Sequence, residues 1–216
     1  MKKTLLLSTL VLLSTQVIAA ENREWISYKK LVETVYLDKF YAAPAAARDK
    51  VLVVPVVHPV NKAIKESDVV FTVDKQVMAV NKSGQMDFVF NPQWVADGTM
   101  IYINQPKGEK MGMGMEMLAR LPDGTQWNYA TLMGSVKQAN ELIKTAAGAL
   151  SLFAPKIKVV TLKFAKPAQL TIQGKAGVLK LASDAKGEIV LKPEEGLMQE
   201  NPLMVLSERP TVASLD

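Results

Sequence analysis

Four methionines stand at alternate positions in the stretch 111-MGMGMEMLARL-121, separated by glycine or glutamate. Thioethers are soft ligands that favour Cu(I), so Met111, Met113, Met115 and Met117 are a candidate copper site. The same alternation is typical of a β-strand, whose successive side chains point to opposite faces. We favour the strand, with the methionines as adaptable packing on a buried face. A third interpretation, an exposed methionine face that receives a flexible partner or an acyl chain, stays open.

Histidine and cysteine are too rare in the chain for most catalytic or metal-binding constellations. There is one histidine and no cysteine, which excludes zinc sites with paired histidines and any cysteine nucleophile. His58 lies in an apolar stretch before Pro59, and we interpret it as a partly buried structural residue rather than a general base. We therefore predict no catalytic residue, no cofactor and no metal site apart from the Cu(I) alternative.

A serine and several carboxylates suggest chemistry without completing a known motif. The stretch 27-SYKK-30 spells S-x-x-K, the nucleophile motif of penicillin-binding serine enzymes, but neither S-D-N nor K-T-G follows it. Ser27 is better placed as the N-cap of a helix. Glu194 and Glu195 stand where the first turn of a short helix is expected, and the helix dipole favours negative charge there.

The three tryptophans could form a platform for a sugar. Trp25 and Trp127 recur at the starts of two similar helical segments, which favours packing over ligand binding. Trp94, near the turn at Asp97, is the one tryptophan that we expect to be partly exposed. Trp94 and Tyr102 are therefore the candidate residues for binding a ligand or partner.

The first twenty residues have the pattern of a secretory signal peptide. Two lysines precede the apolar run 4-TLLLSTLVLLSTQVIAA-20, with Val17 and Ala19 suited to positions −3 and −1 of a cleavage site. We expect cleavage after Ala19 or Ala20, giving a periplasmic or secreted protein without a membrane anchor. Losing the two lysines lowers the formal net charge from +5 to +3, which does not predict binding to nucleic acid.

Apolar periodicity predicts an α+β protein. Residues 25–40 and 129–153 have apolar side chains at spacings of three and four, which indicates two principal helices. Short helical turns are expected at 92–98 and 193–201. Most of the rest predicts strands joined by short turns, hence a mostly antiparallel, sandwich-like sheet. These strands are 51–59, 69–73, 77–80, 86–90, 100–103, 111–121, 157–165, 169–172, 178–182, 188–191 and 203–207.

The two halves of the chain have similar patterns. The order helix, strand, hairpin, short helical turn and strand occurs twice, which predicts two tandem units over residues 21–122 and 123–216. The alternative is one α+β domain whose halves share only their patterning. The matched segments are 25–35 with 127–136, 51–59 with 159–167, 83–92 with 186–193, and 101–106 with 204–210.

Three stretches carry a resemblance to a known family. The segments 34-TVYLDKFYAAPAAARDKV-51, 103-INQPKG-108 and 148-GALSLFAPKIKVVTLKFAKPAQLTI-172 resemble uncharacterised proteobacterial exported proteins that are catalogued only as a domain of unknown function. This resemblance implies no activity, ligand or catalytic residue. The phrase 183-SDAKGEIVLKP-193 is similar to a turn and strand of prealbumin-like domains, which favours a β-sandwich.

A binding module needs no triad, metal or cofactor, which agrees with the motifs described above. We therefore predict a non-catalytic module that binds a protein, a peptide or a glycan in the cell envelope. Two alternatives stay open: a periplasmic enzyme that uses carboxylates or a serine–lysine pair, and a Cu(I) carrier that uses the methionines.

Overall fold

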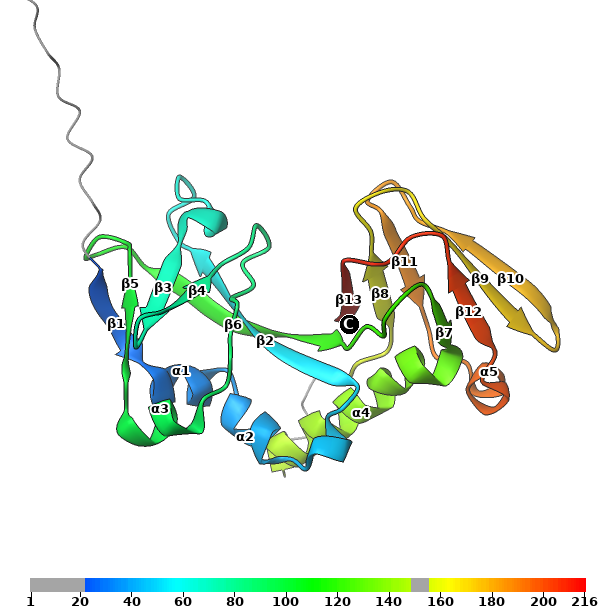
Figure 1. The fold of residues 1–216 in the computed structure, drawn as a ribbon, viewed down its shortest axis with the longest axis horizontal. Coiled ribbons are helices and arrows are strands. Elements are labelled where there is room, and N and C mark those ends of the chain that lie inside the picture. The colour runs from blue at the N-terminus through cyan, green and yellow to red at the C-terminus, as the bar shows by residue number, and fades with distance from the viewer. Residues whose placement is uncertain (1–21, 149–155) are drawn as a thin grey trace, which may run out of the picture.

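The computed structural model describes residues 22–148 and 156–216 (Figure 1). Within these two ranges the chain forms five α-helices, two short 3-10 helices and thirteen β-strands, and the strands make three antiparallel sheets. The predicted α+β class with mostly antiparallel sheet is confirmed. The predicted signal peptide over residues 1–20 lies outside the described residues, and so does the part of the predicted helix 129–153 beyond Gly148.

Two four-stranded sheets lie at the two ends of the molecule (Figure 1). The first consists, in spatial order, of β1 (Arg23–Ser27), β5 (Met100–Ile103), β3 (Val70–Val73) and β4 (Gln76–Ala79). The second consists of β7 (Gln126–Asn128), β12 (Leu203–Leu206), β9 (Gln169–Gly174) and β10 (Gly177–Ala182). Burial alternates along β5, where Ile101 and Ile103 are buried and Tyr102 between them is exposed, and along β9, where Leu170 and Ile172 are buried. β10 at the outer edge is exposed along almost its whole length. Each sheet therefore packs one face on the core.

A five-stranded central sheet joins the two ends. In spatial order it consists of β11 (Glu188–Leu191), β8 (Val160–Lys163), β13 (Val212–Leu215), β6 (Met111–Ala119) and β2 (Val51–Pro59). β2 and β6 pair in continuous register along their whole length, whereas β13 and β6 meet at one pair, Ser214 opposite Leu118. β2 lies at the edge of the sheet, a position that tolerates Pro55 because proline has no backbone N–H to donate.

Helices pack against the central sheet and the two end sheets. They are α1 (Tyr28–Thr34), α2 (Leu37–Ala42), α3 (Pro92–Asp97), α4 (Tyr129–Ala147) and α5 (Glu195–Glu200), with 3-10 turns η1 (Ala45–Ala47) and η2 (Glu66–Asp68). α4 runs along the lower side of the molecule in Figure 1 and contacts β2, β6 and β13. Leu132, Val136 and Ala139 are among its buried residues, as their spacing predicted. α3 and α5 confirm the two predicted helical turns.

The predicted helix over 25–40 is wrong in two places. Residues up to Ser27 form β1, and the helical part is divided at Tyr36, whose φ of 56° is left-handed. Ser27 begins α1 because its side-chain oxygen accepts the N–H of Lys30 at 3.2 Å. The N-cap interpretation of Ser27 is therefore confirmed, and the residues before it pair with β5 instead.

The predicted strand over 86–90 is also wrong. Only isolated bridges occur there, with Gln85 opposite Val56 and Met86 opposite Val80. The reason lies in Tyr28, whose hydroxyl donates to the C=O of Val89 at 2.7 Å. A backbone that bonds to this side chain is not available for a strand ladder.

Tyr28 and Tyr129 occupy similar positions at the starts of α1 and α4. The Tyr28 hydroxyl donates to Val89 C=O and accepts the N–H of Asn91 at 3.0 Å. The Tyr129 hydroxyl donates to a carbonyl just before α5 and accepts the N–H of Glu194, both at 3.1 Å. Each tyrosine thus ties the start of one helix to the start of a later, shorter helix.

Two turns also have the same hydrogen bonds. The side chains of Asn81 and Asp184 each accept the N–H groups two and four residues further along the chain. Each turn contains a glycine with positive φ, Gly84 at 81° and Gly187 at 76°. A Cβ on Gly84 would lie 2.7 Å from the carbonyl oxygen of Val57. A Cβ on Gly187 would lie 2.9 Å from the carbonyl oxygen of Phe164, so both positions require glycine.

Candidate functional site

The four methionines of β6 share one face of the β2–β6 ladder, as their alternation predicted. Met111, Met113 and Met117 are partly buried against the core. Met115 is different, because 41% of its surface is exposed. Methionine as packing material thus describes three of the four side chains, and Met115 is the most exposed of them.

His58 lies on the other face of this ladder. It stands opposite Gly112, whereas the methionines stand opposite the alternate residues of β2. Its side chain is half-exposed, and its Nδ1 lies 3.4 Å from Oε1 of Glu66. The structure therefore does not bring His58 and the thioethers together.

Trp94 and Tyr102 lie in different surroundings. Trp94 is partly buried on α3 and packs edge-on against Tyr28, with ring centroids 5.3 Å apart. Tyr102 is 37% exposed on β5, between Glu24 of β1 and Thr72 of β3. Trp25 is partly buried too, so the expectation that Trp94 is the one tryptophan with exposed surface is wrong.

The backbone of β6 bonds to β2 through every second residue. The N–H of Val60 donates to the C=O of Lys110. With the register of the ladder, this means that the backbone N–H and C=O groups of the even-numbered residues of β6 point toward β2. The bonding direction alternates from residue to residue in an antiparallel ladder. The N–H and C=O groups of Met111, Met113 and Met115 therefore point away from β2. We call these backbone groups the β6 edge.

The β6 edge has no strand partner within residues 22–148 and 156–216. On this side of β6 the described strand that pairs is β13, and its pairing is limited to Ser214 opposite Leu118. The register with β2 shows no bulge along β6. Residues 111–115 contain methionine and glycine alone, without the lysine, proline or bulge that usually protects a free edge.

A recess opens beside the β6 edge, where β13 and β6 separate. Its volume is about 330 Å³, which is at the small end of the range for small-molecule pockets, ~300–1,000 Å³. The apolar part of its lining comes from β6, α4, β13 and the residues before β8. These side chains are Met115, Met117, Ile143, Ile157 and Leu215.

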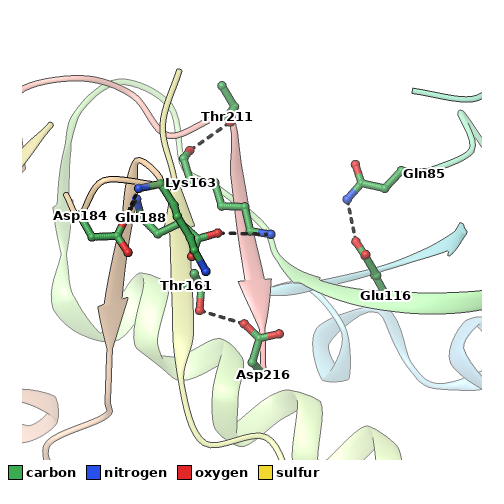
Figure 2. A network of polar contacts seen from close by, with 9 residues as sticks. Gln85, Glu116, Thr161, Lys163, Asp184, Glu188, Thr211 and Asp216 are labelled. Carbon is green, nitrogen blue, oxygen red and sulfur yellow. Dashed lines mark hydrogen bonds and ion pairs between the residues drawn. The ribbon is translucent and has the colours of Figure 1, made fainter. Parts of the chain in front are cut away.

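Polar side chains line the rim of the recess on the outer face of the central sheet (Figure 2). A carboxylate oxygen of Glu116 accepts a hydrogen bond from Nε2 of Gln85 at 2.8 Å. A carboxylate oxygen of Asp216 accepts the hydroxyl of Thr161 at 2.8 Å. Both carboxylates are thus held in place by neutral donors, which leave their negative charge uncompensated.

Lys163 is the basic residue of this rim, and an acidic neighbour offsets its charge. Its Nζ lies 3.7 Å from Oε1 of Glu188 (Figure 2). With that pair neutral, Glu116 and Asp216 leave the rim with net negative charge.

The shifted pKa values belong to groups away from the recess. Burial raises the pKa of Tyr28 to about 12 and also raises the pKa of Tyr129. A hydrogen bond from Gln138 lowers the pKa of the Asp49 carboxyl, and its own backbone N–H lowers the pKa of the Glu66 carboxyl. None of these four groups lines the recess, so the pKa shifts do not mark it as a reactive site.

The described residues contain neither a membrane-spanning helix nor a cluster of metal-ligating side chains. None of the helices that the structure describes is long and apolar enough to cross a membrane. Within the same residues, no group of three or more histidine, aspartate or glutamate side chains is placed to hold a metal ion.

Of the residues that line the recess, the sequence pattern singles out Met115 and Met117 but not the polar residues Glu116, Lys163 and Asp216. Gly112 and Gly114 were the available signal, because glycine within a strand often marks a place where another backbone approaches closely.

The chain belongs to the family described as "Protein of unknown function (DUF2987)", whose model matches residues 52–164. This range runs from β2 to the residue after β8 and includes β6 and α4. The match confirms the resemblance to a family of unknown function. No curated protein and no solved structure matches the chain.

Proposed function

We propose that this protein is a non-catalytic binding module of the cell envelope, and that it binds an extended segment of a partner protein along the β6 edge. The observation that carries the proposal is the run of backbone groups at Met111, Met113 and Met115 that face away from β2 without a strand partner. Strand addition to a free sheet edge is a common way of binding peptides, since main-chain hydrogen bonds supply affinity and side-chain pockets supply specificity.

The recess beside this edge supports a peptide over a glycan. Its apolar lining suits a side chain that projects from an added strand, and exposed Met115 can adapt its shape to that side chain. A glycan site would instead need accessible aromatic faces. Trp94 packs against Tyr28, which leaves Tyr102 as the more accessible of the two candidates.

The Cu(I) alternative has less support than strand addition. Three of the thioethers pack against the core, and His58 lies on the opposite face of the ladder. An enzyme that uses Glu116 and Asp216 would find both in the recess, but nothing in the fold assigns them a substrate.

A proline variant tests the peptide-binding proposal. Met113→Pro removes an N–H that points away from β2, so it blocks the β6 edge while leaving the β2 ladder bonded. The control is Val178→Pro on β10, an edge strand of another sheet. The N–H of Ser183 donates to the C=O of Ala168, so the odd-numbered residues of β10 bond to β9 and the N–H of Val178 points away from β9.

Random peptides displayed on phage are selected against residues 21–216, and their affinities for the two variants are compared with wild type. We expect Met113→Pro to weaken binding by at least about fivefold, since a net backbone hydrogen bond contributes about 1 kcal/mol. Val178→Pro leaves the affinity unchanged. Equal affinity for wild type and Met113→Pro would rule out strand addition at this edge.

We also propose that the protein is exported by its signal peptide, which places the β6 edge in the periplasm or outside the cell. The positive start, apolar run and small residues before Glu21 support this. N-terminal sequencing of the protein from an envelope fraction is expected to begin at Ala20 or Glu21. A chain that keeps Met1 would contradict export by cleavage.

We infer that residues 21–122 and 123–216 are tandem copies of one unit. The two end sheets support this, because β1-β5-β3-β4 and β7-β12-β9-β10 contain corresponding elements in the same order. The paired hydrogen bonds of Tyr28 and Tyr129, and the paired turns at Asn81 and Asp184, give further support.

A further inference from the structure

We propose that the segment bound at the β6 edge carries a lysine or arginine next to an apolar residue. This inference rests on the peptide-binding function proposed above and adds the chemistry of the partner. It follows from the alternation of side chains in the added strand and from the charges around the recess.

An added strand continues the pleat of β6, so its successive side chains point to opposite faces of the central sheet. A residue that stands level with Met115 points to the inner face, toward the apolar lining formed by Met117 and Ile143. The register of β13 places Asp216 level with Glu116, so the first outer-face residue of an added strand stands level with Gly114, beside both carboxylates. Adjacent residues of the segment therefore meet an apolar surface and a charged surface in turn.

The charge that the outer-face residue meets is negative. Glu116 and Asp216 both line the recess, and their hydrogen-bond donors, Gln85 and Thr161, are neutral. Lys163 does not balance them, because it is paired with Glu188. Long side chains reach the diagonal neighbours on the facing strand, and opposite charges are the favourable pair.

The negative rim contrasts with the molecule as a whole, whose formal net charge is +3 once the two lysines of the predicted signal peptide are removed. A basic partner is repelled by the general surface and attracted at this recess. The charge pattern thus favours binding of a basic segment at the β6 edge over binding elsewhere on the surface, as electrostatic complementarity does at other interfaces.

Three fluorescent peptides test this inference: TVTLKLTVT, TVTLQLTVT and TVTLELTVT, which differ only in the central residue. Their dissociation constants for residues 21–216 are measured by fluorescence anisotropy at low and high salt. We expect the lysine peptide to bind at least about fivefold more tightly than the glutamate peptide at low salt, with the glutamine peptide between them. High salt reduces the difference, because screening weakens partly exposed charge pairs.

Two charge-neutralised variants identify the carboxylates. Glu116→Gln/Asp216→Asn is expected to remove the preference for lysine. The matched control is Glu33→Gln/Asp38→Asn, which removes the same charge on α1 and α2 and keeps the preference.

The outcomes separate this inference from the function on which it rests. Equal affinities for the three peptides, all lost in Met113→Pro, would overturn the basic-residue inference and leave strand addition standing. Binding to wild type that is no stronger than binding to Met113→Pro would overturn both. Met115→Pro serves as a second edge variant if Met113→Pro does not fold.

Discussion

At the scale of single residues, Tyr28 makes the same kind of hydrogen bonds within the first half of the molecule as Tyr129 makes within the second. Each hydroxyl both donates to and accepts from backbone groups at the start of a short helix. The sequence predicted that these tyrosines occupy matched positions, because both follow a tryptophan at the start of a helical pattern. It did not predict their hydrogen bonds, since the groups they contact lie more than sixty residues away in the chain.

Tyr28→Phe tests this role. We expect it to lower the free energy of unfolding at neutral pH by about 1–3 kcal/mol, because a buried carbonyl and N–H lose their partner. Tyr129→Phe is expected to have an effect of the same size. Urea denaturation measures both, and unchanged midpoints would contradict the role.

The raised pKa of Tyr28 also gives a pH dependence. Its pKa rises from 10.0 to about 12 in the folded protein, so the unfolded chain releases this proton at lower pH than the folded chain does. The stabilisation is therefore complete below pH 10.0 and is lost as the pH rises toward about 12. Tyr28→Phe should show a smaller loss of stability over this range, measured by denaturation at a series of alkaline pH values.

At the scale of elements, β6 is the strand on which the functional proposal depends. Its existence and the shared face of its methionines were predictable from alternation alone. Its free edge was not, because the pairing of a strand depends on distant segments, here β2 on one side and the short β13 on the other. β13 itself was missed, since 207-SERPTVASLD-216 is short, polar and interrupted by proline.

Two proline variants test, without a ligand, which residues of β6 bond to β2 through their backbone. Met113→Pro is expected to lower the free energy of unfolding by roughly 1–2 kcal/mol, mainly through lost packing of a partly buried side chain. Gly114→Pro is expected to cost about 3 kcal/mol or more, because the N–H it removes bonds to β2 and leaves a carbonyl unpaired. Urea denaturation compares the two. Equal losses would show that the bonding pattern of β6 is assigned wrongly.

At the scale of the whole molecule, the two halves share one core. The buried side chains form a contiguous cluster that includes residues from both end sheets, among them Ile101 and Leu170. Gln138 of α4 adds a polar link, since it accepts the N–H of Lys50 at 2.7 Å and donates to Asp49 at 2.7 Å. The similar patterning of the halves was visible in the sequence, whereas their joint core was not, because it depends on how the central sheet closes between them.

A shared core predicts that the protein unfolds in one transition. Ile101→Ala and Leu170→Ala, which lie in opposite end sheets, should each lower the stability by about 2–5 kcal/mol and shift that same transition. Far-ultraviolet and near-ultraviolet circular dichroism should give coincident curves in urea. Two separate transitions, each sensitive to one variant, would show that the halves fold independently.

The central claim is that β6 keeps one side of its backbone free for a partner strand, and amide hydrogen exchange resolved by NMR tests it most directly. The account predicts rapid exchange at Met111, Met113 and Met115, and slow exchange at the residue that follows each of them, because only those residues bond to β2. Slow exchange at all positions from 111 to 116 in the free protein would contradict the account, since it would mean that both sides of the strand are already occupied.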